Sequence, residues 1–383
     1  MLQGHDIICL ATDWAGHIDS SHHIMRRFMR SNRVLWVNSA GLRPPRLSCR
    51  DLRRAWNKVF SQHNTPHASQ GPVAVYSPRV LPFFGSKAVN AFNRKMLTRD
   101  LRKRIRALRF RNIIVWACMP PASLVADRLD AEVLIYYVMD DYSLLPSVNT
   151  KAMLALERRL FEMSDVVFAT AEHLRQAKSG YGKPITLLPH GVEFGHFRGP
   201  PPAPPKPLAS TPKPIVGFFG LLAPWTDLEM MAAVAKANPE LSFVFVGDVQ
   251  TSLRGLDTLP NVHVFPKVSY QVLPSYARQF DVSVLPFVVD EMTLNVNPLK
   301  LMEYFAMGAP VVSTRLPAVE KYQPHVRIAD TAEEFSDAIR EALAADSEEA
   351  RAGRVEIARA NSWDSRVELA SSVIEEALKQ KRG

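Results

Sequence analysis

Short apolar runs alternate with stretches of helical periodicity along most of the chain. They occur at Asp6–Ala11, Arg33–Asn38, Asn112–Ala117, Ala131–Val138, Asp165–Ala169, Ile215–Phe219, Leu241–Val246, Val262–Phe265, Val282–Phe287 and Pro310–Thr314. Strands that are apolar on both faces are typical of parallel sheets, because crossover helices cover both sides. We therefore expect an α/β protein with two Rossmann-like, doubly wound sheets.

A proline-rich segment lies between the first five runs and the last five. Eight of the sixteen residues over 199–214 are proline, which removes backbone donors and favours an extended chain. We predict an N-terminal domain over 1–198, a linker over 199–214, a C-terminal domain over 215–360, and a helix over 361–383 that could cross back to the N-terminal domain. Ligands of such sheets bind at the carboxyl ends of the strands, so we expect the two domains to face a cleft lined by these edges.

The basic residues are concentrated in the first half of the chain. Residues 1–200 contain 29 Lys and Arg against 15 Asp and Glu, although the net charge of the whole chain is only +9. Such a field favours an anionic partner. Arg43–Lys58 and Arg94–Arg111 place basic and apolar residues at helical spacing, which suits the surface of an anionic membrane. Two solvated basic helices are the alternative.

The cysteine content and hydropathy limit the class of protein. The three cysteines form no CxxC pair, which argues against a disulfide scaffold or a thiolate zinc site and fits a reducing compartment. No run of about 18 uncharged apolar residues occurs, and the N-terminus lacks the features of a signal peptide. We expect a cytoplasmic protein that can associate peripherally with the inner face of the plasma membrane.

The segment Glu291–Thr314 carries the clearest chemical signal. Asn297 and Pro298 predict a helix start, and Lys300 and Glu303 are three residues apart on that helix. Free amides, the helix dipole and a lysine together would bind an anion, and a carboxylate one turn further could accept hydrogen bonds from a ribose diol. Alternatively, Lys300 is solvated and pairs with Glu303.

These residues resemble the donor-binding segment of family-4-like glycosyltransferases, which have the two-domain GT-B fold. The resemblance rests on N-P-L-K-L-x-E-Y-x-A-x-G-x-P-V-V-S-T from Asn297, supported by His190-Gly191-Val192-Glu193, Val216–Gly220, residues 261–287 and Asn361–Trp363. It implies that Glu303 binds the ribose and that Lys300 and the amides of Asn297–Lys300, which include that of Leu299, bind the diphosphate. Gly220 would border this site, the backbone near Val268 would bind the base, and His190 would lie near the acceptor.

Two departures from the family pattern concern the donor site. Asn295 stands where an acidic residue usually precedes the conserved glutamate by eight positions, and it would face the sugar. The basic pair that often follows the first strand of the second domain is replaced by Gly220–Asp227, so Lys300 would be the principal counter-charge of the phosphates. No D-x-D motif occurs, which fits transfer without a metal or another cofactor.

The acceptor side requires a group that takes a proton from the attacking hydroxyl in an inverting mechanism. Asp13 follows the first apolar run and Asp140 and Asp141 follow the fourth, so all three would lie at strand ends. Similarity to family members favours Asp140 and Asp141 as catalytic residues. His22 and His23 begin the next helical stretch, and they either contact the acceptor or serve packing.

The resemblance implies transfer of a sugar from a nucleotide sugar, with a UDP-sugar favoured over a GDP-sugar, to a lipid-linked or saccharide acceptor in cell-surface polysaccharide assembly. Three alternatives stay open: a sugar-nucleotide epimerase of the same architecture, a catalytically inactive partner subunit, and a nucleic-acid-binding protein. The last is disfavoured because aromatic residues are sparse among the basic runs and no nucleic-acid motif appears.

Overall fold

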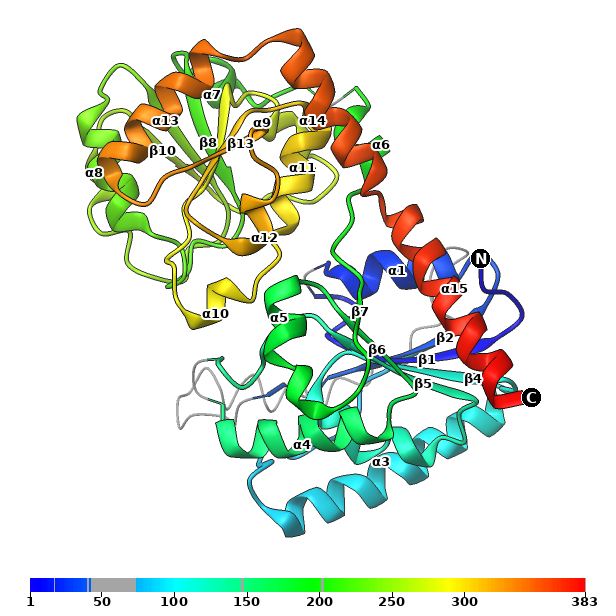
Figure 1. Ribbon diagram of the computed structural model, residues 1–383. Coiled ribbons are helices and arrows are strands. Elements are labelled where there is room, and N and C mark those ends of the chain that lie inside the picture. Colours follow the sequence, from blue (N-terminus) through cyan, green and yellow to red (C-terminus); the bar gives the residue numbers. More distant parts are fainter. Residues whose placement is uncertain (17, 40, 43–73, 146–147, 201–202, 383) are drawn as a thin grey trace. The chain divides into compact units, whose positions relative to one another are not determined.

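The computed structural model describes residues 1–16, 18–39, 41–42, 74–145, 148–200 and 203–382. The chain forms two compact units (Figure 1). Unit 1 comprises Met1–Pro189 and Arg366–Gly383, and unit 2 comprises His190–Ser365. Each unit is built on one parallel sheet with helices on both faces, so the expected fold class is confirmed.

The sheet of unit 1 has the strand order β3-β2-β1-β4-β5-β6-β7. The five central strands match the predicted runs to within two residues, whereas the edge strands β3 and β7 are too short to give an apolar pattern. The bounds are β1 Asp6–Ala11, β2 Arg33–Asn38, β3 Ala74–Tyr76, β4 Ile113–Ala117, β5 Val133–Val138, β6 Val166–Ala169 and β7 Thr186–Leu187.

Helices cover both faces of this sheet. Leu101 of α3, Phe161 of α4 and Leu174 of α5 share one core with the sheet, while Phe28 of α1 packs on the opposite face, its ring 6.0 Å from that of Trp116. In Figure 1, α3 and α4 lie on one side of the sheet and α1 on the other. The bounds are α1 Ser20–Phe28, α3 Lys87–Ala107, η1 Pro120–Leu124, η2 Ala126–Arg128, α4 Thr150–Met163, α5 Glu172–Ala177 and η3 Ser179–Tyr181.

The sheet of unit 2 has the strand order β10-β9-β8-β11-β12-β13. All pairings are parallel, so the carboxyl ends of β8, β9 and β11 lie at one edge. Five of the six strands were predicted, and only the short edge strand β13 was not. The bounds are β8 Ile215–Phe219, β9 Ser242–Val246, β10 Val262–Phe265, β11 Val282–Leu285, β12 Val311–Ser313 and β13 Val326–Ile328.

Two apolar cores hold the helices of unit 2 against its sheet. One core includes Leu301 and Phe305 of α11, and the other includes Met231 of α8 and Phe335 of α13. The helix bounds are α6 Phe194–Arg198, α7 Lys206–Ala209, α8 Leu228–Ala237, η4 Leu256–Thr258, α9 Leu273–Ala277, α10 Glu291–Leu294, α11 Leu299–Met307, α12 Pro317–Glu320, α13 Ala332–Ala344 and α14 Glu348–Ala360.

The proline-rich segment differs from the predicted linker. The boundary between the units falls after Pro189, so residues 199–214 belong to unit 2. Residues 206–209 form the short helix α7, and Leu208 is buried in a core of unit 2. The chain is therefore helical and not extended at residues 206–209, where a single leucine among prolines packs into the core.

The C-terminal region consists of separate helices. α14 ends at Ala360, and α15 (Trp363–Arg382) follows it and corresponds to the helix predicted over 361–383. Residues of α15 from Arg366 onward belong to unit 1. The amide of Leu2 donates to Ser371 Oγ at 3.0 Å, and Lys381 Nζ lies 2.7 Å from Asp165 Oδ2. The C-terminus therefore completes unit 1 rather than unit 2.

Two features bear on the membrane hypothesis. The basic helix α3 begins at Lys87, earlier than the predicted Arg94, whereas Arg43–Lys58 lies outside the described residues. Within the part of the chain that the structure describes, no helix is both long enough and apolar enough to cross a bilayer.

Candidate functional site

The first candidate site lies at the carboxyl end of β8 in unit 2. Gly220 follows β8 with φ +136°, a conformation open to glycine but strained for other residues. Gly247 follows β9, and a Cβ atom at residue 247 would lie 1.7 Å from the carbonyl oxygen of Gly220. Two glycines thus allow the two strand ends to approach each other and leave open backbone at this edge.

The side chain of Lys300 occupies the space beside Gly220. A Cβ atom at residue 220 would lie 2.1 Å from Lys300 Cε and 2.8 Å from its Nζ. The ammonium group lies 5.3 Å from the ring centre of Phe218 and 5.7 Å from that of Phe287, which are cation–π distances. Lys300 therefore folds back from α11 onto the edge of the sheet, which argues against the reading of a solvated lysine.

Lys300 and Glu303 influence each other without forming a close ion pair. Among the described residues, no carboxylate lies within 4.0 Å of Lys300 Nζ and no hydrogen bond engages it. Burial lowers the pKa of Lys300, and the charge of Glu303 opposes this. Burial also raises the pKa of Glu303 to about 7, against the effect of Lys300. Both groups are half-buried and available to a polar ligand.

The start of α11 differs from the prediction. The helix begins at Leu299, and Pro298 occupies the N-cap position, so Asn297 is not the cap and no side chain caps this end. The amides of Leu299 and Lys300 consequently start the helix without a side-chain acceptor from the cap residue. This arrangement retains the anion-binding character expected of a helix N-terminus.

The remaining predicted donor residues surround this edge in different ways. Asn295 is buried and ends α10, where its Nδ2 donates to the carbonyl of Glu291 at 2.9 Å. Asn297 is half-buried, with interactions of its own. Val268 follows β10 and packs against the core that includes α11.

The second candidate site lies at the carboxyl ends of β1 and β5 in unit 1. Asp13 is exposed in the loop after β1, where its carbonyl accepts from the amide of Gly16 at 2.9 Å. Asp140 is exposed after β5. The strands β1 and β5 flank β4, so both aspartates lie at the same edge of this sheet.

Asp140 has the properties of a proton acceptor. Surrounding protein reduces the hydration of its carboxylate although the residue is open to solvent, and together with the charges of Asp19 and Asp141 this raises its pKa to about 7. Within the described part of the chain, no hydrogen bond or ion pair engages the Asp140 side chain. A carboxylate with a pKa near neutrality is well matched to taking a proton at neutral pH.

Asp141 lies in a different environment although it is the next residue. Lys178 Nζ lies 2.7 Å from its Oδ2, and Ser143 donates to its Oδ1 from the amide and the hydroxyl. Burial alone would raise its pKa, but these hydrogen bonds lower it. Lys178 also contacts the buried Glu157 at 2.9 Å. Asp141 is therefore anchored in a buried network.

The structure places the predicted histidines away from an open surface. His22 is buried, with Nδ1 2.9 Å from Asp19 Oδ1 and Nε2 3.3 Å from the carbonyl oxygen of Trp14. It completes a capping box with Asp19 at the start of α1. His23 is also buried. His190 is half-buried near the ring of Trp363 at 6.4 Å.

Three residues of these sites were not predicted from the sequence. Gly247 directly follows the apolar run that forms β9, and a glycine at a strand end is a sequence signal that could have identified it. Asp19, rather than Asp13, supplies the charge from the first loop that acts on Asp140. Lys178 has no local motif, because its partners are 21 and 37 residues away.

No cluster of three or more His, Cys, Asp or Glu side chains with the geometry for a metal occurs among the described residues.

Comparison with known proteins agrees with this geometry. Residues 213–345, which contain Gly220, Gly247, Lys300 and Glu303, match the family of group 1 glycosyl transferases. Unit 2 is therefore similar to the group 1 glycosyl transferases over most of its length.

A second similarity is to the protein TuaH. TuaH of Bacillus subtilis (strain 168), described as a putative teichuronic acid biosynthesis glycosyltransferase, is 27% identical over 231 residues. The match covers 55% of this chain and 58% of TuaH, so it spans a little more than half the length of this relative.

Solved structures show that the GT-B fold extends over the whole chain. Sucrose-phosphate synthase from Thermosynechococcus elongatus superposes with a TM-score of 0.71 at 13% identity, covering 98% of this chain and 100% of that one. HepE from Anabaena, solved in complex with UDP and glucose, gives a TM-score of 0.69 at 14% identity, covering 97% and 100%. At these identities the likeness shows the fold.

Proposed function

We propose that this GT-B chain transfers a sugar from a nucleotide sugar, a UDP-sugar in preference to a GDP-sugar, to a lipid-linked or saccharide acceptor in cell-surface polysaccharide assembly. The observation that carries the proposal is the position of Lys300, whose ammonium group packs beside Gly220 at the sheet edge without an ion pair among the described residues. The similarity to TuaH, described as a putative teichuronic acid biosynthesis glycosyltransferase, and to HepE, solved with UDP and glucose, supports the class of reaction and donor.

The donor would bind across the carboxyl edge of the unit 2 sheet. Lys300 and the amides of Leu299 and Lys300 would neutralise the diphosphate, and Glu303 would accept hydrogen bonds from the ribose hydroxyls. The open backbone at Gly220 lets a phosphate approach the strand end. The backbone near Val268 would bind the base, and Asn295 would border the sugar.

Leaving-group stabilisation would come from the protein alone. As the bond between the sugar and the diphosphate breaks, negative charge grows on the departing phosphate oxygens. Lys300 would stabilise this charge, since its side chain lies beside Gly220 at the strand end. In this proposal the reaction needs neither a metal ion nor another cofactor.

The acceptor would bind on unit 1, at the edge that carries Asp140. Asp140 would take the proton of the attacking hydroxyl, because its carboxylate is open to solvent and its pKa is raised to about 7. Asp141 would hold the loop in place through Lys178.

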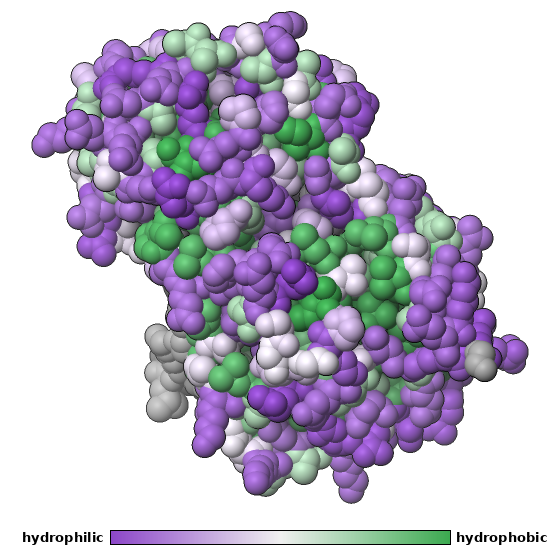
Figure 2. Space-filling view, viewed as in Figure 1, coloured by the Kyte–Doolittle hydropathy of each residue, from purple (hydrophilic) through white to green (hydrophobic). Residues whose placement is uncertain are grey.

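Docking on an anionic membrane would bring the acceptor site to its substrate. On α3, Lys95, Arg99, Lys103 and Arg106 are exposed along one side of the helix. Figure 2 shows mainly hydrophilic residues over the part of unit 1 where Figure 1 places α3. Each basic residue near an anionic leaflet contributes about 1 kcal/mol.

Calorimetric titration with UDP and GDP, followed by transfer assays with UDP-glucose and an extract of bacterial lipid acceptors, tests the function. We expect UDP to bind and UDP to be released only when acceptor is present. Absence of nucleotide binding would contradict the proposal. Binding without transfer would indicate an inactive partner subunit, and interconversion of free UDP-sugars would indicate an epimerase. Co-sedimentation with vesicles of phosphatidylglycerol and phosphatidylcholine at low salt tests the docking.

A further inference from the structure

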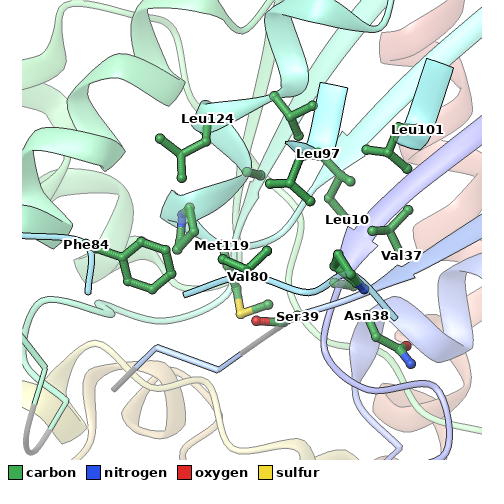
Figure 3. A pocket seen from close by; sticks show the side chains of 15 residues that line it. Leu10, Val37, Asn38, Ser39, Val80, Phe84, Leu97, Leu101, Met119 and Leu124 are labelled. Atoms are coloured by element: carbon green, nitrogen blue, oxygen red, sulfur yellow. The ribbon is translucent and has the colours of Figure 1, made fainter. Parts of the chain in front are cut away.

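An apolar pocket lies in unit 1 beside the acceptor edge of the sheet (Figure 3). The strand ends of β1 and β2 contribute Leu10 and Val37, the helix α3 contributes Leu97 and Leu101, and the segment after β4 contributes Leu124. The cavity measures about 60 Å³. This volume holds about four water-sized groups, which corresponds to a short stretch of hydrocarbon chain.

The lining is apolar except at one side. Asn38, the last residue of β2, and Ser39, the residue after it, are the polar residues of the lining, and Figure 3 shows them away from Leu97 and Leu124. Asn38 is held in place: its Oδ1 accepts from the amide of Trp14 at 2.9 Å, and its Nδ2 donates to Ser77 Oγ at 2.9 Å. Since Trp14 follows Asp13, the polar side of the pocket borders the loop that carries the candidate acceptor residues.

The other side of the pocket continues toward an exposed apolar surface. Phe84 lines this pocket and also a neighbouring one, of which Phe83 and Met153 form part. Phe83 is 49% exposed, Leu81 is 46% exposed and Phe92 of α3 is 54% exposed. Three large apolar side chains are thus open to water within twelve residues of the chain, and one of them, Phe83, lines the neighbouring pocket.

Two basic residues are sequence neighbours of the residues that line the two pockets. Arg79 lies between the pocket residues Pro78 and Val80, and Lys87 follows Ser86 of the neighbouring pocket. Both are exposed, and neither forms an ion pair with a described residue. The surface therefore combines free positive charge with an apolar cavity, which is complementary to an amphiphile that carries a phosphate.

We propose that this pocket binds the hydrocarbon chain of a phosphate-bearing lipid acceptor, close to its phosphate end, with Arg79 and Lys87 near the phosphate. The inference rests on the proposed function and narrows its acceptor from "lipid-linked or saccharide" to lipid-linked. A free oligosaccharide would leave the apolar walls and the exposed Phe83 without a partner. The hydrocarbon chain of the lipid binds without nucleotide, because every residue of the pocket belongs to unit 1.

Calorimetric titration of the full chain with octyl phosphate below its micelle concentration, and with ethyl phosphate as the matched headgroup, tests the inference. We expect octyl phosphate to bind at least tenfold more tightly than ethyl phosphate. Ala122→Phe would fill the pocket from its half-buried wall, and Val80→Trp would narrow the pocket. Each variant is expected to bind octyl phosphate at least tenfold more weakly than the wild type does. Ala107→Phe, at an exposed position at the end of α3 outside the pocket, is the control and should bind as the wild type does.

Several outcomes would overturn the inference. Equal affinities for octyl phosphate and ethyl phosphate would show that the protein binds the phosphate but not the octyl chain. Unchanged octyl phosphate binding in both pocket variants would show that the octyl chain binds outside this pocket. A third outcome is that octyl phosphate does not bind and that the wild type forms a dimer which the variant Leu81→Ser/Phe83→Ser does not form. This outcome would assign the apolar surface to contact with a second copy of the protein. UDP titration and thermal melting of each variant separate these results from misfolding and from failure of the donor site.

Discussion

Asp140 and Asp141 are adjacent in the chain, yet only Asp141 is bound to Lys178, whose Nζ lies 2.7 Å from its Oδ2. Asp140 remains open to solvent with its pKa raised to about 7. Two consecutive residues therefore provide one carboxylate that can accept a proton and one that holds the loop. The difference arises from a lysine that is distant in sequence, and it assigns the two residues different roles in the proposed reaction.

Replacing Asp140 with Asn should abolish most transfer while leaving UDP binding unchanged. Loss of a general base typically lowers the rate about 10²–10⁴-fold. Turnover with saturating donor and a UDP titration measure the two effects. Asp13→Asn, an exposed aspartate at the same sheet edge, is the matched comparison and should retain more activity. Equal losses in both variants would contradict the assignment of Asp140 as the base.

Turnover should rise with pH across neutrality. Asp140 accepts a proton only when ionised, so the active fraction increases from pH 6 to pH 8 around its pKa of about 7 and then levels off. Glu303 also has a pKa raised to about 7, and its ionised form is the better acceptor for ribose hydroxyls, so UDP affinity should rise over the same range. Measuring kcat at saturating donor isolates Asp140. A kcat that does not change between pH 6 and pH 8 would argue against Asp140 as the proton acceptor.

Replacing Lys300 with Met should weaken UDP binding by about 10- to 100-fold. A hydrogen bond to a charged group contributes about 1.5–3 kcal/mol, and Lys300 is the cation beside the strand end at Gly220. Calorimetric titration with UDP and with uridine measures the effect. The affinity for uridine should fall much less than the affinity for UDP, because uridine lacks phosphates. Lys236→Met, at an exposed lysine of α8, serves as control. Wild-type UDP affinity in Lys300→Met would remove Lys300 from the site.

Replacing Gly220 with Ala should displace Lys300 and destabilise unit 2. The new Cβ would lie 2.1 Å from Lys300 Cε, and the φ of +136° adds strain of about 1–3 kcal/mol. We expect lower UDP affinity and a lower free energy of unfolding in denaturant. Gly195→Ala provides the control, since nothing lies within 4 Å of a Cβ there. Unchanged UDP affinity would show that the backbone at residue 220 does not shape the donor site.

Replacing Lys178 with Met should destabilise unit 1 by about 3–5 kcal/mol, because Glu157 and Asp141 would lose their shared buried cation. Urea unfolding followed by tryptophan fluorescence measures the change. The double variant Lys178→Met/Glu157→Gln should recover part of the loss, since it removes one uncompensated charge. Lys151→Met, at an exposed position of α4, should be close to wild type. A loss of similar size in Lys151→Met would contradict the role of the buried network.

The strands show how far local patterns reach. Val133–Val138 and Ile215–Phe219 could be predicted because strands buried on both faces are continuous apolar runs. The edge strands Ala74–Tyr76, Thr186–Leu187 and Val326–Ile328 could not, because two or three residues carry no periodic signal. The burial of Leu208 within the proline-rich segment was also unpredictable, since it depends on a core formed by residues far along the chain.

The sequence by itself determined the α/β class, most strands and the donor segment around Lys300 and Glu303, because apolar periodicity and short motifs are encoded in neighbouring residues. Only the tertiary structure decided that Lys300 lies against Gly220, that His22 is buried with Asp19, and that Lys178 pairs with Asp141. Each of these contacts joins elements whose approach depends on how the sheets and helices pack, and packing fixes burial, hydrogen bonding and therefore the pKa of each group.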